Sequence, residues 1–422
     1  MVKLPSFIKQ RESNLNASRN PKKSGLDYTL FSVILGLSIF GSLMVYSGSA
    51  IVAVKQGFEP HHYFIRQITW IALGLVGMYL AYKIDYRTVA KLSLPAFIVT
   101  IALLILVLFI NEGEDVRRWI KLGPFDLQPS EIAKLTTLIY LSSLLAKHKE
   151  VKTINKQTFT EHVKSELLPY WGAAAIVLVL ILLERDMDTT LMLGATTFIV
   201  YFIAGRDLLH TLGSIITGLL TSIILAGAMV VEKYRLTRLG TYFDFWNKGT
   251  ISDPYSSGFQ FRQILVAVAS GGIFGVGFGE SRQKYHYLGE TAFTDTIFAI
   301  FAEEFGLVGC VILVSVFVFI FLKGYKIAMG AKDRLGFLLA ISITTWITLQ
   351  AVLHIGANVA LIPINGNTLP FLSYGGSSTV INLSAIGILL NIAKGGSQSE
   401  ERRVVSLPQR NRAQLHKLRK RR

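Results

Sequence analysis

Long apolar stretches separated by short polar segments dominate the chain. Residues 31–46, 94–110, 171–183 and 311–322 contain almost no charge. Because about 20 mostly apolar residues suffice to cross the hydrocarbon core of a bilayer, this pattern predicts an all-α polytopic membrane protein. We expect ten transmembrane helices, at approximately 27–47, 67–83, 90–110, 131–147, 169–184, 189–205, 208–232, 295–323, 335–359 and 378–393.

Lysine and arginine residues gather in every second polar segment, which indicates how the helices are oriented. They are frequent in both tails and in the loops near 83–91, 147–168 and 323–334. Because cytoplasmic loops carry an excess of positive charge, we expect both termini to be cytoplasmic. The predicted organisation is a basic tail (1–26), a ten-helix domain (27–393) with a large extracytoplasmic loop (233–294) between helices seven and eight, and a second basic tail (394–422). The N-terminal residues lack the features of a signal peptide, so we expect the first span to remain as an anchor.

The composition removes several classes of function. The chain is 51% hydrophobic and only 17% charged, which excludes an ordinary soluble domain. The net charge of +16 is explained by the cytoplasmic loops, and no nucleic-acid-binding motif accompanies it. The single cysteine, Cys310, excludes an intrachain disulfide, and His286 has no partner at ligand spacing, so we predict no protein metal site.

Two predicted outer loops carry positive charge against this bias. The first contains Arg117 and Arg118, and the loop at 233–294 contains seven lysine and arginine residues. Guanidinium groups match phosphate oxygens with paired donors, so anion recognition is one interpretation, and simple solvation is the other. The glycine-rich apolar stretch 264–278 in the second loop predicts a re-entrant or interfacial segment.

Ionisable residues also occur at membrane depth, where they usually face a cavity or a partner. Glu131 and Lys134 begin the fourth predicted span at a spacing that allows them to pair. Asp295 begins the eighth. From the residues alone, Thr294 or Asp295 is more simply interpreted as a helix cap, with catalysis as the alternative. The last outer loop, rich in glycine, proline and hydroxyl side chains, suits hydrogen bonding to a sugar or phosphate.

Four motifs, in order, resemble those of the SEDS family (FtsW/RodA/SpoVE). They are Arg117-Arg118-Trp119-Ile120 with Gln128-Pro129-Ser130-Glu131 and Lys134; Ser270-Gly271-Gly272 with Gly275, Gly277 and Gly279; Glu290, Thr294-Asp295 and Ile297-Phe298-Ala299 with Glu303-Glu304; and Leu369-Pro370-Phe371 with Ser373-Tyr374-Gly375-Gly376-Ser377-Ser378. The resemblance covers all ten predicted spans and leaves out only the tails.

The resemblance implies a peptidoglycan glycosyltransferase that polymerises lipid II, an undecaprenyl-diphosphate disaccharide pentapeptide, in the bacterial cytoplasmic membrane. The catalytic aspartate of the family falls on Asp295, which we expect to act as general base. The expected substrate-binding residues are Arg117, Arg118, Trp119, Gln128, Ser130, Glu131, Lys134, Gln260, Lys284, Glu290, Ser373, Tyr374, Ser377 and Ser378. No tightly bound cofactor is expected, and a divalent cation (Mg²⁺ or Mn²⁺) remains an open alternative.

Residues 281–284 and 367–371 resemble the division-type branch, FtsW, which implies a class B penicillin-binding protein and other divisome proteins as partners at the division site. The elongation type, RodA, is the alternative within the family, and a lipid II flippase or a non-catalytic scaffold is the alternative outside it. The chain departs from many relatives after the fifth span. Where they have EPDLGTA, residues 184–190 read ERDMDTT, so the proline and the glycine are absent.

Overall fold

The computed structural model of this chain is a bundle of long helices. It describes residues 26–110, 117–123, 125–147, 163–205, 213, 215–218, 227, 233–251, 255 and 258–405. The helices before the large loop are α2 (Tyr28–Lys55), α3 (His62–Lys83), α4 (Tyr86–Lys91), α5 (Ser93–Ile110), α6 (Pro129–Lys147), a π-helical turn η1 (Val163–Leu167), α8 (Leu168–Leu183) and α9 (Met187–Ala204). Those that follow are α11 (Lys233–Lys248), α12 (Phe259–Ser270), α13 (Gln283–His286), a 3₁₀ helix η2 (Gly289–Phe293), α14 (Ile297–Met329), α15 (Arg334–Asn358) and α16 (Gly376–Val405).

Within the described residues, eight helices are long and apolar enough to cross a membrane. They correspond to predicted spans one to three, five, six and eight to ten, so a polytopic helical membrane protein is confirmed. Helix α6 coincides with the predicted fourth span but is not one of the eight. Most of the predicted seventh span, 208–232, lies outside the described residues. The count of ten spans therefore stays a prediction.

A small hairpin corrects the all-α prediction. Strands β1 (Ile120–Leu122) and β2 (Phe125–Leu127) pair antiparallel, with Ile120 opposite Leu127. Gly123 in the turn has φ +68°, a left-handed value that glycine adopts without steric cost. Three-residue strands are too short to give an alternating pattern in the sequence, which is why the hairpin was not predicted.

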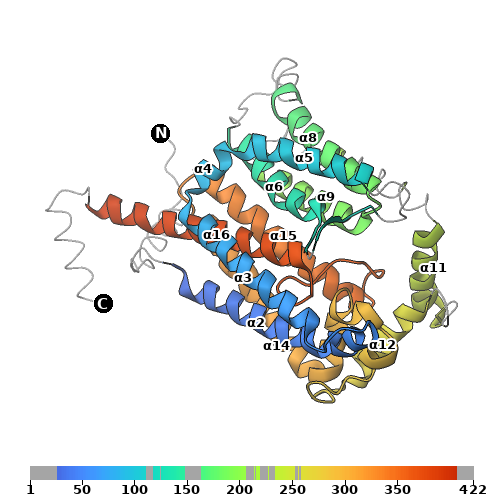
Figure 1. Ribbon diagram of the computed structural model, residues 1–422. Helices are drawn as coiled ribbons and strands as arrows, with labels where there is room; N and C mark the ends of the chain where they lie inside the picture. Colours follow the sequence, from blue (N-terminus) through green and yellow to red (C-terminus); the bar gives the residue numbers. More distant parts are fainter. Residues whose placement is uncertain are drawn as a thin grey trace, which may run out of the picture.

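The helices form two groups joined by α15 (Figure 1). Helices α2, α3, α14 and α16 pack together on one side, α5, α6, α8 and α9 on the other, and α15 contacts both groups. Small residues allow the closest approach, which is the usual basis of helix packing in membranes. A Cβ on Gly387 of α16 would lie 2.3 Å from the backbone oxygen of Met78 in α3. The α3–α16 contact therefore requires glycine at that position.

Helix α14 is interrupted at Gly306, where the loop after α12 packs against it. Gly306 has φ 63° and ψ −165°, which breaks the helix after its third turn. The freed backbone groups are taken up by the loop after α12: the amides of Val276 and Gly277 donate to the carbonyls of residues 303 and 304 (3.0 and 3.1 Å), and those of Leu307 and Val308 donate to the carbonyls of residues 272 and 273 (2.9 and 3.1 Å). The predicted re-entrant segment is thus an α-helix followed by a loop that docks into α14.

Ionic contacts gather at one end of the bundle, among residues predicted to be cytoplasmic. Arg87 pairs with Asp333 at 2.7 Å, and Lys323 pairs with Asp27 at 3.1 Å. Both aspartates also cap their helices, because Asp27 accepts from the amide of residue 30 and Asp333 from that of residue 336. The predicted sidedness itself is not tested by these contacts.

Candidate active site

Asp295 lies in the connection between η2 and α14, outside the membrane-spanning helix. The N-cap of α14 is Thr296, which makes no side-chain capping bond. The capping role that the residues alone favour for Thr294 or Asp295 is therefore wrong. The backbone around the aspartate is held instead by Asn358, whose Nδ2 donates to the Asp295 carbonyl at 3.2 Å. The Asp295 carboxylate is consequently left to face the neighbouring loop.

A second carboxylate, that of Asp188 at the start of α9, reaches the same place. Its Oδ2 accepts a hydrogen bond from the amide of Gly366 at 2.7 Å. A Cβ on Gly366 would lie 3.1 Å from Asp188 Oδ2 and 3.7 Å from Asp295 Oδ2. The two carboxylates therefore converge on one backbone position in the segment between α15 and α16.

The surroundings of Asp295 raise the pKa of its carboxyl group. Burial raises the pKa of its carboxyl group to about 7, and the negative charge of Asp188 acts in the same direction. The charges of Arg238 and Arg118 oppose that rise. A carboxylate with a pKa near neutrality is suited to accept a proton from a substrate and release it again.

The two arginines come from separate segments and are fixed by backbone carbonyls. Arg118 Nη2 donates to the carbonyl of Arg185, and Arg238 Nη1 donates to that of Ile364 at 3.4 Å. Arg238 stands on α11, in the large loop, whereas Arg118 precedes β1. Positive charge is thus brought beside the two carboxylates from both outer loops that the sequence marked as unusually basic.

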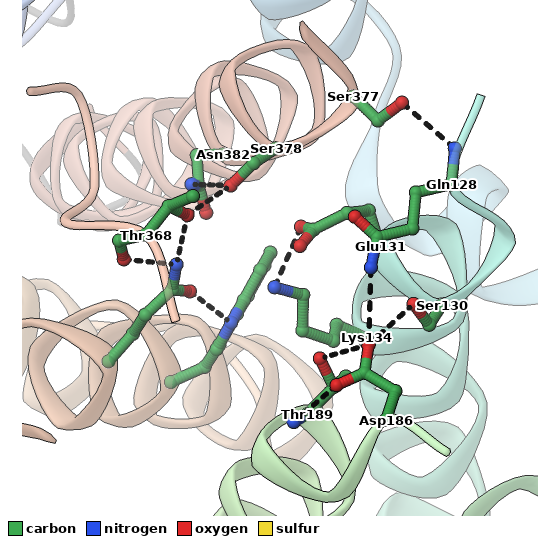
Figure 2. Close-up of polar contacts among 12 residues, drawn as sticks. Gln128, Ser130, Glu131, Lys134, Asp186, Thr189, Thr368, Ser377, Ser378 and Asn382 are labelled. Carbon is green, nitrogen blue, oxygen red and sulfur yellow. Dashed lines mark hydrogen bonds and ion pairs between the residues drawn. The ribbon is translucent and has the colours of Figure 1, made fainter. Parts of the chain in front are cut away.

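The start of α6 is joined to the turn before α9 by a polar network (Figure 2). Asp186 Oδ2 accepts from Gln128 Nε2 at 3.1 Å and from Ser130 Oγ at 3.5 Å. Its Oδ1 also accepts from the amide of Thr189 at 3.2 Å, which caps α9. On the other side, the amide of Gln128 donates to Ser377 Oγ at 3.1 Å. Three predicted binding residues thus lie in one network.

Glu131 and Lys134 form the pair that their spacing predicts. The Lys134 Nζ lies 2.7 Å from Glu131 Oε2, and the lysine side chain is only 1% exposed. The ammonium also lies 5.5 Å from the ring centre of Trp346 on α15. Figure 2 draws this ion pair together with the Asp186 network. The lysine charge is therefore already compensated within the protein.

The last outer loop is attached directly ahead of Asp295. Ser373 Oγ donates to the carbonyl of Thr294 at 2.7 Å, and the amide of Tyr374 donates to that of Phe293 at 2.8 Å. Ser378 Oγ accepts from Asn382 Nδ2 at 3.1 Å. Ser373 and Tyr374 therefore attach this loop to the backbone ahead of Asp295, whereas the bond of Ser378 lies within α16.

Three other predicted binding residues lie elsewhere. Lys284 is buried and pairs with Glu304 of α14 at 2.6 Å. Glu290 Oε1 accepts from Gln56 Nε2 of the segment after α2 at 2.6 Å. Gln260 is half-buried on α12. Nearer the site, Arg117 is half-buried and Trp119 is exposed. The binding roles of these five residues stay predictions.

Sequence reasoning missed Asp188, Arg238 and Gly366 as site residues. The useful signal was the departure from EPDLGTA, because it placed a charged residue in a tight turn where relatives have glycine. Arg238 stood among several basic residues of its loop, and nothing in their spacing separated it from the others.

Comparisons with known proteins agree on one group. A family model described as "Cell cycle protein", for FtsW, RodA and SpoVE proteins, matches residues 28–398. A probable peptidoglycan glycosyltransferase FtsW from Trichlorobacter lovleyi is 36% identical over 372 residues, which are 87% of this chain and 93% of that protein. The stage V sporulation protein E of Bacillus subtilis is 34% identical over 88% of this chain and 98% of that protein.

Solved structures with this fold are also known. One chain belongs to a peptidoglycan synthase complex described as coordinating polymerization and crosslinking. It has a TM-score of 0.67 and 25% identity, and the match covers 89% of this chain and 99% of that chain. The rod shape determining protein RodA of Thermus thermophilus has a TM-score of 0.59 at 24% identity, covering 87% of this chain and 97% of that chain. The second match bears on the fold alone.

Proposed function

This chain belongs to the FtsW/RodA/SpoVE family, and from that premise we propose that it is a division-type peptidoglycan glycosyltransferase that polymerises lipid II. The single observation that supports this most is the position of Asp295. It is a partly buried carboxylate with a pKa near 7, placed beside two arginines and ahead of a membrane helix. The carboxylate can accept a proton near neutral pH, the arginines can attract an anionic substrate, and the position next to a membrane helix suits a substrate anchored in lipid.

The reaction balances with this carboxylate as the proton acceptor. The 4-hydroxyl oxygen of the acceptor sugar attacks the anomeric carbon of the donor, and a new carbon–oxygen bond forms there. The bond from that carbon to the diphosphate oxygen breaks, and polyprenyl diphosphate leaves with the electron pair. Asp295 takes the hydroxyl proton. Direct displacement inverts the anomeric configuration.

The leaving diphosphate needs positive charge nearby as its own charge develops. We propose that Arg118 supplies it together with Arg117, and that Lys134 contributes less because Glu131 already meets its charge. Arg118 is supported because its charge acts on Asp295 and its position is fixed by a backbone carbonyl, and Arg238 meets both conditions as well. Gln128, Ser130 and Ser377 would hold the loops around the sugar, through the Asp186 network and the contact with β2.

A divalent cation has no dedicated place among the described residues. No group of three or more His, Cys, Asp or Glu side chains in that part of the chain could hold a metal ion. Mg²⁺ is often held by one or two carboxylates together with substrate phosphates, so a divalent cation stays an open alternative, and we derive no step through one.

The proposed subtype and partners follow the relatives. The FtsW names favour the division type over the elongation type. The synthase-complex match supports a crosslinking partner, for which we propose a class B penicillin-binding protein, with other divisome proteins, at the division site. A flippase or an inactive scaffold is the competing function, and the Asp295 site favours neither, because neither needs a base.

The decisive experiment is polymerisation of labelled lipid II by the purified full chain, with and without a co-expressed class B transpeptidase. Wild type is compared with Asp295→Asn and with a matched control, Asp244→Asn. Asp244 pairs with Lys248 at 2.7 Å on α11 and is not among the charges that shift the pKa of Asp295, so its change removes a carboxylate of the same loop region. We expect glycan chains from wild type and the control, and none from Asp295→Asn. Chains from all three would exclude Asp295 as the base, and chains from none would favour the flippase or scaffold.

The ten-span topology can be tested separately. The only cysteine is Cys310, so a Cys310→Ala chain gives a clean background for single reporter cysteines. With a membrane-impermeant thiol reagent on intact cells, we expect labelling at Asp244→Cys and none at Lys332→Cys. Labelling of both or of neither, in cells whose membrane is intact, contradicts the predicted sidedness.

A further inference from the structure

Asp188 has no counterpart in the motif that its turn otherwise resembles. Residues 184–190 read ERDMDTT where many relatives have EPDLGTA, so Asp188 takes the place of the glycine. A glycine there would bring neither a charge nor an acceptor. The question is what this chain does with a carboxylate at that position.

The first consequence is a hydrogen bond across the site. Asp188 Oδ2 accepts from the Gly366 amide at 2.7 Å and so attaches α9 to the segment between α15 and α16. Other side chains also hold that segment: Arg238 donates to the carbonyl of Ile364, His354 Nδ1 lies 2.7 Å from the carbonyl oxygen of Asn367, and Gln350 Nε2 donates to the carbonyl of Thr368 at 2.9 Å. The Asp188 bond is the one made at Gly366, the residue that also approaches the Asp295 carboxylate.

The second consequence is electrostatic. Both carboxylates approach Gly366. A Cβ on that residue would lie 3.1 Å from Asp188 Oδ2 and 3.7 Å from Asp295 Oδ2. The charged groups that face Asp295 come from four places: Asp188 on α9, Arg238 on α11, Arg118 before β1, and Asp186 in the turn before α9. Burial is the main cause of the raised pKa of Asp295, and the charge of Asp188 is the largest electrostatic contribution that adds to it.

We propose that Asp188 is a positioning residue for Asp295, which fixes the Gly366 segment over the site and places a second negative charge beside the base. The proposal rests on the proposed function for its catalytic meaning, although the geometry stands without it. A chain with glycine at this position would have a base that is deprotonated at lower pH and a less firmly held loop. Asp188 thus helps to keep the pKa of Asp295 near neutrality and holds the Gly366 segment beside it.

Two substitutions separate the two effects. Asp188→Asn keeps an oxygen that accepts from the Gly366 amide but removes the charge, and Asp188→Gly removes both. We expect the pH midpoint of the polymerisation rate to fall by about one unit in both variants, because a like charge nearby disfavours ionisation. Only Asp188→Gly should also raise the KM for lipid II, by roughly threefold or more, because it alone removes the oxygen that accepts from the Gly366 amide.

The same turn offers a matched control. Glu184 is fully buried, and burial raises the pKa of its carboxyl group to about 9, so it is already neutral at pH 7. Glu184→Gln therefore removes a carboxyl group of the same turn without removing a charge, and we expect its pH midpoint to match wild type.

A measurement without substrate keeps this proposal separate from the proposed function. Carbodiimide modifies protonated carboxyl groups, so modification of Asp295 followed by mass spectrometry across pH reports its titration, with Asp295→Asn as the blank. We expect the midpoint to move down in Asp188→Asn and Asp188→Gly and to stay in Glu184→Gln. An unmoved midpoint, or a loss of activity that is equal at every pH, overturns the role of Asp188. Absence of polymer from wild type would count against the proposed function, and the labelling would still decide the role of Asp188.

Discussion

Two groups of carboxylates flank the first turns of α14, and they differ in how their charge is met. Glu304 pairs with the Lys284 ammonium at 2.6 Å, and Glu303 accepts from Ser281 Oγ at 2.5 Å and from the amide of Arg282 at 3.0 Å. Ahead of the helix, Asp295 and Asp188 approach the same glycine and so face each other as like charges. The charges of Glu303 and Glu304 are met by donors within the protein. Asp295 and Asp188 instead repel each other, and a proton taken from the substrate would remove that repulsion.

Burial alone therefore does not distinguish the proposed base from carboxylates that hold the fold together. Glu303 and Glu304 are less exposed than Asp295. Buried charge that is met by a lysine or by hydrogen-bond donors holds a structure together, whereas buried charge that faces a like charge has a raised pKa and can do chemistry.

The largest effect is expected for Asp295, the proposed base. Asp295→Asn should lower the polymerisation rate by about 10²- to 10⁴-fold, which is the usual contribution of general acid–base catalysis. Its thermal unfolding in detergent should match wild type, because Asp295 makes its hydrogen bond to Asn358 through the backbone. A large loss of thermal stability together with the loss of rate would return Asp295 to a structural role.

The next effect tests the carboxylates that are met by donors. Lys284→Met leaves Glu304 buried without its partner and should cost about 3–5 kcal/mol of unfolding free energy. The double variant Lys284→Met/Glu304→Leu should recover most of that loss, because an apolar pair of similar volume is often tolerated. If Lys284→Met instead raises the KM for lipid II at unchanged stability, Lys284 belongs to the substrate site, as its sequence motif predicts.

A smaller effect concerns the contact between the loop after α12 and the break in α14. A Cβ on Gly275 would lie 2.1 Å from the Glu304 carbonyl oxygen, whereas one on Gly279 would meet nothing within 4 Å, although both residues have positive φ. Gly279→Ala should cost about 1–2 kcal/mol of stability, from backbone strain alone. Gly275→Ala should cost more and should also reduce activity, because it separates the loop from α14. Equal costs would show that the loop does not depend on its contact with the helix break.

The smallest effect is the pH dependence of the wild type. Because the pKa of Asp295 is raised to about 7, the proton-accepting form is complete only above that pH. The rate should therefore fall as pH drops through 7, by about tenfold per unit below it, as expected for one titrating base. A rate that stays constant down to pH 5 would contradict the like-charge description of the site.

The fold was largely accessible from the sequence, and the site only in part. Apolar length predicted the eight helices, and the i, i+3 spacing predicted the Glu131–Lys134 pair. The convergence of Asp188 and Asp295 could not be predicted, because it joins residues from α9 and the η2–α14 connection through a third segment at Gly366. Likewise, the spacing of Lys284 from Glu304 did not show that the two would meet, since that contact depends on how the loop returns to α14.

The break in α14 has a consequence for how the outer surface can vary. The loop and the helix are joined by four main-chain hydrogen bonds, so the joint does not depend on which side chains residues 273–276 carry, apart from the glycine. Two of those side chains, Ile273 and Phe274, are 60% and 81% exposed. The exposed side chains of this loop can therefore change, to suit a different lipid or a different neighbouring protein, while the loop stays docked to α14 and Asp295, which precedes that helix, keeps its position.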